Sequence, residues 1–283
     1  MDPQVSLLPD RRRLHMHHGP IDLIVQVEGS EREAGLRRGV ARFRTILAEL
    51  ADELPLLRSP VAEGRALHGP VARAMQRAAV AHSPAFVTPM AAVAGAVADA
   101  ILQAICDGDG LDRVHVNNGG DIAFQLAPGT RLVAAIAGID GARITIPAES
   151  PVRGIATSGW RGRSQSLGIA DSVTVLARNA AAADVAATLI ANAVDLPGHP
   201  AIRRIPAVEL FDDSDLGARP VTVSVGRLTQ GEVDEALRHG IHAARRCMAR
   251  GLIEAAFLGL AGKTRSLGAA PFTALSQKEP IDA

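Results

Sequence analysis

The sequence is poor in aromatic side chains and has no excess of charge of either sign. Tyr is absent, Trp occurs once, and aromatic residues make up 2% of the 283 residues. Thirty basic residues balance thirty acidic ones, so the formal net charge is zero. Nucleic-acid-binding proteins offset phosphate charge with a basic excess, and single-strand binders stack bases on aromatic rings. We therefore expect no nucleic-acid partner.

Cysteine and the common catalytic motifs are also scarce. Cys106 and Cys247 fit neither a zinc-site spacing nor a Cys-x-x-Cys motif, which predicts two small buried side chains in a reducing compartment. No Gly-x-Gly-x-x-Gly follows a strand, and neither His-Glu-x-x-His nor Gly-x-Ser-x-Gly occurs. Gly262-Lys263-Thr264 resembles the end of a phosphate-binding loop, but Phe257 stands where its first glycine would be. We reject that interpretation.

Membrane association is not indicated either. The N-terminal residues have no apolar core of a signal peptide. The longest apolar stretch, residues 89–106, contains Asp99 and has no basic or aromatic anchors, so it predicts a buried helix. We expect a cytoplasmic protein without a membrane partner. Residues 19–264 are predicted to form one domain, residues 1–18 a flexible N-terminal tail and residues 265–283 a C-terminal tail.

The hydrophobic patterning indicates an α+β fold. Strands are predicted at residues 21–27, 114–117, 121–126, 131–139, 144–147, 173–177 and 221–225. Helices are predicted at residues 30–54, 71–81, 89–106 and 179–194, and over about twenty residues after Thr229. Because strands occur in runs joined by hairpin turns, we expect largely antiparallel sheets packed with helices, in one lobe or two.

Helix starts and one hairpin carry local signals. Ser30 with Glu33, and Thr229 with Glu232, have the spacing of a capping box. Thr88 and Asn179 are suitable N-cap residues. The pair at positions 140–141, Asp-Gly, is typical of a tight hairpin turn. These signals fix where the predicted elements begin.

Two glycine-containing turns could bind phosphate. Residues 117–121 read NNGGD, and paired glycines let backbone N–H groups approach phosphate oxygens closely. Residues 154–160 read GIATSGW, where two hydroxyl side chains end a strand-like run. An ordinary tight turn and a plain strand end explain these two segments equally well.

A third polar pattern lies on the helix at residues 179–194. Asp184, Thr188 and Asn192 follow one another at intervals of four residues, so neighbours lie about 6 Å apart on nearly one helix face. A carboxylate and a hydroxyl, completed by a carbonyl and waters, could hold Mg²⁺. The same three residues could instead form the polar face of a surface helix, with Asp184 favourably close to the helix N-terminus.

Taken in order, the three patterns resemble the ApbE flavin-transferase superfamily. NNGGDIA resembles its N-x-G-G-D signature, IATSG its A-T-S-G turn, and ADVAAT its A-D-A-x-x-T helix. TPMAAVAGAVAD and HGPIDLIVQVEG are similar to an uncharacterised cytoplasmic branch. The resemblance implies an ApbE-like fold and an activity related to the Mg²⁺-dependent transfer of FMN from FAD to a protein threonine.

The resemblance also implies roles for individual residues. The side chains of Asp184 and Thr188, with the backbone carbonyl of Ala156, would hold Mg²⁺. The cofactor phosphates of FAD or FMN would lie against two turns. The residues of these turns are Asn118, Gly119, Gly120, Asp121, Thr157, Ser158 and Gly159.

Two segments of the transferases have no counterpart in this sequence. No Met-Gly-Thr follows residues 21–27, and WRGRSQSLGIADS stands in place of a histidine-containing loop with Pro-Thr-Gly. From that interval we take Ser164 and Asp171 as candidate catalytic residues. We expect a Mg²⁺-dependent, transferase-like protein that acts on or binds a phosphorylated flavin or nucleotide.

Other functions remain open at this stage. One alternative is a non-catalytic protein that binds a flavin, nucleotide or pterin, because the transferases' histidine loop is missing. Another is an enzyme of one-carbon (pterin-type) cofactor biosynthesis, although no residue points to a pterin. The sequence also leaves open whether the chain forms a homodimer.

Overall fold

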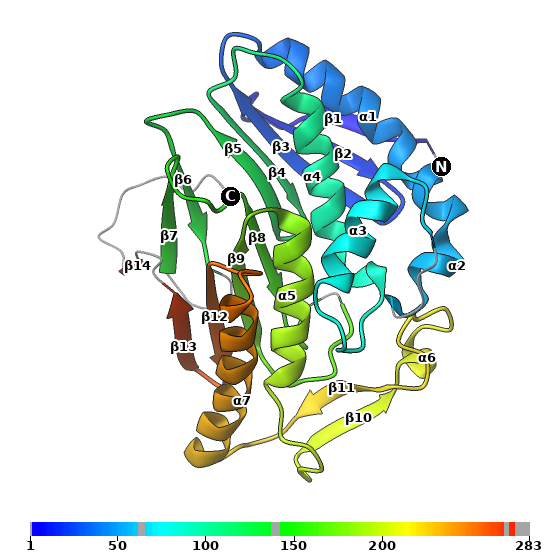
Figure 1. Cartoon of the computed structure of the whole chain (residues 1–283), viewed down its shortest axis with the longest axis vertical. Coiled ribbons are helices and arrows are strands. Elements are labelled where there is room, and N and C mark those ends of the chain that lie inside the picture. The colour runs from blue at the N-terminus through cyan, green and yellow to red at the C-terminus, as the bar shows by residue number, and fades with distance from the viewer. Residues whose placement is uncertain (1, 62–65, 137–141, 163, 269–271, 275–283) are drawn as a thin grey trace.

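The computed structural model describes residues 2–61, 66–136, 142–162, 164–268 and 272–274. Its centre is a nine-stranded sheet in which every neighbouring pair is antiparallel (Figure 1). In spatial order the strands are β1 (Gln4–Leu7), β2 (Arg13–His18), β3 (Ile21–Glu28), β4 (Arg113–Asn118), β5 (Asp121–Leu126), β8 (Gly154–Ser158), β9 (Ser172–Ala177), β12 (Ala255–Leu260) and β13 (Lys263–Gly268).

Two smaller sheets flank the large one. β6 (Arg131–Ala135), β7 (Ala142–Pro147) and β14 (Phe272–Ala274) form a three-stranded antiparallel sheet. β10 (Ile202–Pro206) and β11 (Pro220–Val225) form a two-stranded antiparallel ribbon. The predicted α+β fold with largely antiparallel sheets is therefore confirmed. Whether the chain forms one domain stays a prediction.

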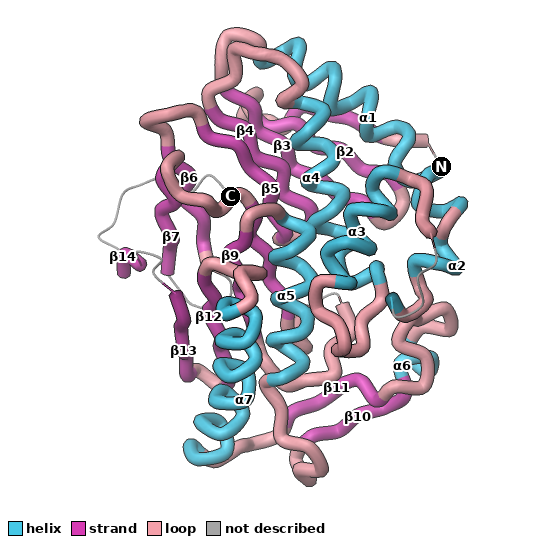
Figure 2. The backbone as a smooth tube through the Cα atoms, in the orientation of Figure 1, coloured by secondary structure: helices cyan, strands magenta, loops and turns pink. Residues whose placement is uncertain are grey.

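Helices cover one face of the large sheet, as Figures 1 and 2 show. In chain order the helices are α1 (Arg32–Asp52), α2 (Leu54–Leu57), α3 (Pro70–Val80), the short 3₁₀ helix η2 (Pro89–Ala92), α4 (Val93–Ile105), α5 (Ala180–Ala193), α6 (Ala207–Leu210) and α7 (Gln230–Ala249). α4 packs on β4 and β5, α5 on β8 and β9, and α7 on β12 and β13. No helix in the described ranges is long and apolar enough to cross a membrane.

Small side chains allow the two central helices to pack closely. α4 buries Gly95, Ala96 and Ala98, and most of α5 is alanine. A Cβ added at Gly95 would lie 2.3 Å from the carbonyl oxygen of Ala180, at the start of α5. Because no real Cβ tolerates that contact, the crossing of α4 and α5 requires glycine here.

Helix starts agree with the sequence signals in two of four cases. The Asn179 side chain accepts a hydrogen bond from Ala182 N–H, and Thr229 and Glu232 form the predicted capping box. The Ser30–Glu33 capping box is wrong, because α1 begins after Glu31 and Ser30 Oγ instead donates to the carbonyl of Gly110. Thr88 precedes η2 but makes no capping bond, since its hydroxyl donates to the Asp215 carboxylate. The Asp-Gly turn at 140–141 lies outside the described residues.

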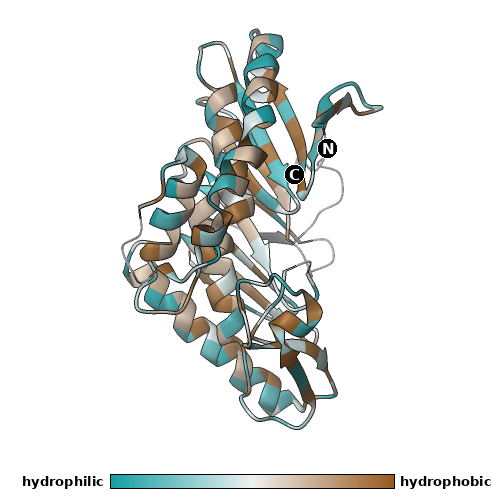
Figure 3. Ribbon diagram, turned by 90° about the vertical axis from the view of Figure 1, so that its right-hand side faces the viewer, coloured by the Kyte–Doolittle hydropathy of each residue, from teal (hydrophilic) through white to brown (hydrophobic). Residues whose placement is uncertain are grey.

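The structure corrects the predicted N-terminal tail and those parts of the predicted C-terminal tail that it describes. Residues 4–18 form the β1–β2 hairpin, in which Met16 is fully buried because β2 pairs with β3. Figure 3 shows this hairpin projecting beside the N-terminus. At the other end, residues 265–268 belong to β13 and residues 272–274 form β14, whereas residues 275–283 lie outside the described ranges. These strands are short, so their sequences carry too few residues for a clear alternating pattern.

Candidate functional site

α5 points Asp184 and Thr188 into one cavity of about 350 Å³. Asp121, the first residue of β5, lines the same cavity, and so do Met90, Ala91, Val93 and Ala94 of η2 and α4. Sequence spacing placed Asp184 and Thr188 on one helix face, and the packing of α5 on β8 turns that face toward β5. The surface-helix alternative for these two residues is therefore wrong.

Asp184 is half-buried and held by main-chain donors. Its Oδ2 accepts a hydrogen bond of 3.0 Å from the N–H of Gly95. Burial raises the pKa of its carboxyl well above the usual value, and the nearby charge of Asp121 raises it further. Burial likewise raises the pKa of Asp121 to about 7, although the Thr157 N–H donates to its Oδ1 at 3.2 Å. Two carboxylates that repel each other in one cavity favour a bound cation.

A third carboxylate fixes α5 against α4. Asp99 accepts hydrogen bonds of 3.0 and 2.9 Å from the N–H groups of Ala180 and Ala181, the first two residues of α5. Because Asp184 in turn accepts from α4, each helix supplies a carboxylate to main-chain donors of the other. This double connection sets where Asp184 lies relative to β5.

The glycine turn between β4 and β5 opens into a second cavity of about 590 Å³. Gly119 and Gly120 have φ angles of +65° and +115°, which side chains with a Cβ rarely adopt. Nothing lies within 4 Å of a Cβ added at Gly120, so the turn is open to a ligand. The second cavity also contacts Thr157, Ser158 and Gly159 at the end of β8.

The two cavities meet at a common wall. Both are lined by Asp121 and Ser164, together with Met90, Val93 and Ala94. The phosphate-binding residues predicted from sequence, including Asn118, therefore lie on one side of Asp121, and the predicted metal-binding side chains lie on the other. Asn118 also braces α4, because its Nδ2 donates to the carbonyl of Ala94 at 3.0 Å.

Three predicted positions do not lie in this cleft. Ala156 is fully buried in the core and lines neither cavity. Asn192 accepts hydrogen bonds from Ser166 and Leu167 instead.

Asp171, a candidate catalytic residue, is the third such position. Its carboxylate accepts bonds from Arg161 Nε at 2.7 Å and from the N–H of Ala261 at 2.6 Å, and it lines neither cavity. Ser164, the other candidate, is exposed at the common wall of the cavities. Of the two predicted catalytic residues, the structure brings only Ser164 to the cleft.

One wall of the first cavity could not be predicted from the sequence motifs. Phe211, Ser214, Asp215 and neighbours in the segment between β10 and β11 line it. No motif marked this segment, and the acidic run FDDSD at residues 211–215 was its one visible signal. The pairing of β10 with β11 brings this segment to the cavity, far along the chain from Asp121 and Asp184.

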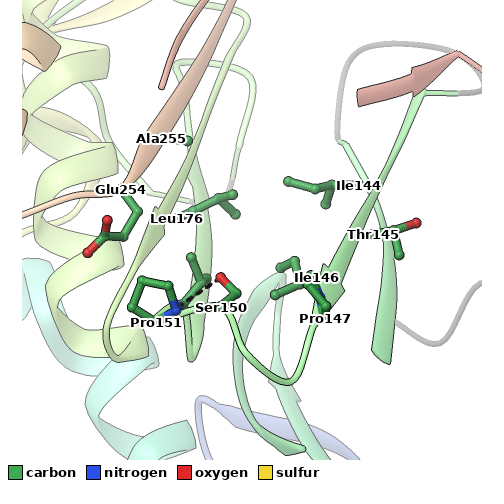
Figure 4. Close-up of a pocket in the computed structure, with 10 residues that line it drawn as sticks. Ile144, Thr145, Ile146, Pro147, Ser150, Pro151, Leu176, Glu254 and Ala255 are labelled. Atoms are coloured by element: carbon green, nitrogen blue, oxygen red, sulfur yellow. Dashed lines mark hydrogen bonds between the residues drawn. The ribbon is translucent and has the colours of Figure 1, made fainter. Parts of the chain in front are cut away.

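A further hollow, shown in Figure 4, lies between β7 and the large sheet, where Leu176 of β9 and Ala255 of β12 line it. Its volume is about 180 Å³, and Ile144, Ile146 and Leu176 give it a mainly apolar lining. The one charged residue that lines it, Glu254, directs its carboxylate away from the hollow and pairs with Arg178. This hollow offers no catalytic group.

The donor set of the first cavity fits a hard divalent cation. Carboxylate and hydroxyl oxygens are the ligands that Mg²⁺ prefers, and Asp184 and Thr188 supply both. No group of three or more His, Cys, Asp or Glu side chains able to hold a metal occurs in the described ranges. A cation here would therefore draw its remaining ligands from main-chain oxygens, water or a bound phosphate.

Comparisons with known proteins give relatives in archaea. A UPF0280 protein of Methanopyrus kandleri is 34% identical over 176 residues, which cover 60% of this chain and 69% of the relative. A UPF0280 protein of Methanothrix thermoacetophila is 42% identical over 38% of this chain and 46% of the relative. A third, from Methanospirillum hungatei, is 37% identical over 42% of this chain and 50% of the relative. The chain spans about half the length of the latter two.

One solved structure and one family model complete the comparison. The apo form of the flavinyl transferase ApbE from Pseudomonas stutzeri matches with 11% identity and a TM-score of 0.42, covering 95% of both chains. The model of the family described as AbpE bacteria matches residues 5–266, nearly the whole chain. The resemblance drawn from the three motifs is thus confirmed, and the chain belongs to the AbpE bacteria family.

Proposed function

We propose that this chain is a Mg²⁺-dependent transferase-like protein that binds a phosphorylated flavin or nucleotide and acts on its phosphate. One observation carries the proposal. Asp184 and Thr188, whose oxygens suit a hard cation, share a cavity with Asp121, and Asp121 also lines the cavity of the Gly119–Gly120 turn. A cation on the first side and a phosphate at the turn would then lie close enough to interact.

The charge of the first cavity supports a dependence on the cation. Four aspartates line it, with Arg58 as the one basic residue among the lining side chains of the described ranges. A phosphate group entering this cavity alone would meet carboxylates and be repelled. Phosphate binding should therefore require a divalent cation in the same cavity.

The residues around the junction suit phosphoryl chemistry. When bound at Asp184 and Thr188, the cation would supply neutralisation of charge on phosphate oxygens. The open glycine turn would position the phosphate through backbone N–H groups, which need no reorganisation during reaction. The exposed hydroxyl of Ser164 lies at the common wall, where an acceptor or a water molecule would approach. In-line attack on phosphorus needs little more than this positioning.

The location of Asp171 favours a second candidate function. Its carboxylate is engaged by Arg161 and Ala261 outside the cleft, so it cannot serve as a general base for a ligand there. A protein that binds the flavin or nucleotide without turnover would need the same cation site and glycine turn but no base. The two candidates differ in whether the bound ligand is cleaved.

Turnover can be measured directly. We expect purified protein incubated with Mg²⁺ and FAD to release AMP, with EDTA-treated protein as the control. NAD and ATP serve as alternative substrates under the same conditions. Release of AMP or another phosphate product that stops with EDTA supports the transferase. Mg²⁺-dependent binding of FAD without any product selects the binding protein, and the absence of both contradicts the proposal.

A further inference from the structure

Phe211 is placed unusually for a large apolar side chain. It is 58% exposed, the largest exposed fraction of any large apolar residue in the described ranges. It is also the only aromatic residue among the described side chains that line either cavity of the cleft. In a chain with 2% aromatic residues, one of them stands uncovered in the wall of the cavity that holds Asp184 and Thr188.

Polar contacts, and not the packing of Phe211, hold its segment over the cavity. Asp213 pairs with Arg58, Asp215 accepts from Thr88, and Ser214 Oγ donates to Gln165. These contacts come from three different parts of the chain. The backbone is also closed on itself, because the N–H of Ala207 donates to Arg219 at 2.9 Å. The segment is therefore fixed in place while the ring of Phe211 keeps a free face.

The surroundings define what that face could contact. Asp213 and Asp215 beside Phe211 repel anions, so the phosphate of a ligand would not lie there. An uncharged planar ring would gain apolar contact with Phe211, and N–H groups on such a ring would find carboxylate acceptors nearby. An aromatic face next to acceptors is the arrangement that suits a heteroaromatic base.

We propose that Phe211 forms a stacking subsite for the heteroaromatic ring of the ligand, so that residues 211 and 213–216, which line the cavity, determine which ring the cleft accepts. This inference rests on the proposed function, because it places the ring relative to a phosphate held at the cation. Phe211 acts in binding and takes no part in cleavage. Its neighbour Leu210, 43% exposed but lining neither cavity, provides a matched control.

The test compares a ligand that has rings with one that has none. Titration calorimetry in Mg²⁺ would measure affinities for FAD, ATP and inorganic pyrophosphate in wild type, Phe211→Ala, Phe211→Trp and Leu210→Ala. Loss of a stacking ring weakens binding roughly tenfold to a hundredfold. We expect the affinity of Phe211→Ala for FAD or ATP to fall by that factor, and its affinity for pyrophosphate to equal that of wild type. Phe211→Trp should retain the affinity and quench flavin fluorescence, and Leu210→Ala should match wild type.

Different results would overturn the subsite and the proposed function. If Phe211→Ala binds FAD and ATP as tightly as wild type, Phe211 is not a ring subsite. The same holds if its affinity for pyrophosphate falls by the same factor as its affinity for FAD and ATP. If wild type binds pyrophosphate with Mg²⁺ and gains nothing from the rings of FAD or ATP, the subsite is wrong and the cation site stands. If wild type binds none of the three with Mg²⁺, the proposed function fails and the subsite fails with it.

Discussion

Asp121 and Asp184 show how far individual residues could be assigned from sequence. The four-residue spacing of Asp184 and Thr188 predicted a shared face, and the structure places both in one cavity. Asp121 was assigned to phosphate through its glycine turn, yet it also faces Asp184 closely enough for its charge to raise the pKa of Asp184. That proximity depends on α5 packing near β5, which local sequence does not encode.

The burial of Asp121 should cost stability in the absence of a cation. Its pKa in the folded protein is raised to about 7 from 3.8. A carboxyl with a raised pKa favours folding at low pH, and this contribution is lost as pH rises from about 4 to about 7. We expect Asp121→Asn, in EDTA, to be more stable than wild type by on the order of 2–4 kcal/mol above pH 7. In urea unfolding, the difference in free energy of unfolding between the variant and wild type should disappear toward pH 4. A difference that does not change with pH would contradict the burial of a charge.

At the scale of elements, α4 and α5 form the frame of the site. Their start and end points were predicted well, because alanine-rich periodicity and the Asn179 cap are local signals. Their mutual contact was not predicted. In the sequence Asp99 is a lone charge in an apolar stretch, whereas in the structure it accepts hydrogen bonds from the first turn of α5. The Ser30–Glu33 pattern failed for the opposite reason, since a distant carbonyl took the serine hydroxyl.

A substitution at the crossing of these helices should disturb both stability and the site. In Gly95→Ala the added Cβ would meet Ala180 O at 2.3 Å, so α4 must move away from α5. We expect a loss of about 1–3 kcal/mol in urea unfolding. Gly231→Ala in α7 is the control, because nothing lies within 4 Å of its added Cβ, and there alanine should stabilise by about 0.5–1 kcal/mol. Equal effects of the two substitutions would argue against the close crossing.

The capping box of α7 should make the stability of the protein depend on pH. Hydrogen bonds from the Thr229 backbone and from His199 lower the pKa of Glu232 to about 2 from 4.5. A lowered pKa contributes stability above pH 4.5 that is lost as pH falls toward 2. Wild type should therefore exceed Glu232→Gln in unfolding midpoint at pH 6, and the two should converge by about pH 2. A difference that persists unchanged at that pH would show that the carboxylate charge is not involved.

At the scale of the whole molecule, the cleft depends on contacts between distant parts of the chain. β5 lies next to β8 in the sheet, although β6 and β7 separate them in sequence, and this brings Asp121 beside Thr157. The segment between β10 and β11 closes the first cavity from a still later part of the chain. Family motifs could indicate that Asp121 lies beside Thr157. No local pattern could indicate that the segment between β10 and β11 closes the cavity. The strands β1 and β2 are not evident from the sequence because they depend on pairing, β2 with β3 and β1 with β2.

Ligand binding at the cleft should stabilise the whole chain, but only when both Mg²⁺ and the phosphate-containing ligand are present. At about 100 times the dissociation constant, a ligand adds roughly 2.7 kcal/mol to the free energy of unfolding. For a chain of this size that is an increase of roughly 5–10 °C in Tm. We expect Mg²⁺ with pyrophosphate to give this increase in a thermal-shift assay and pyrophosphate with EDTA to give none. An equal increase in Tm with pyrophosphate in EDTA would show that pyrophosphate binding does not require the cation.

The most direct test of the account is Mn²⁺ binding followed by electron paramagnetic resonance, with Mn²⁺ standing in for Mg²⁺. Asp184→Asn keeps the shape of the side chain and an oxygen to accept from the Gly95 N–H, but it removes the charge. Asp107→Asn, at an exposed aspartate in the loop after α4, is the matched control. We predict one Mn²⁺ site in wild type and in Asp107→Asn, tightened by pyrophosphate, and its loss in Asp184→Asn. Mn²⁺ bound to Asp184→Asn with unchanged affinity would contradict the cation site on which the proposed function depends.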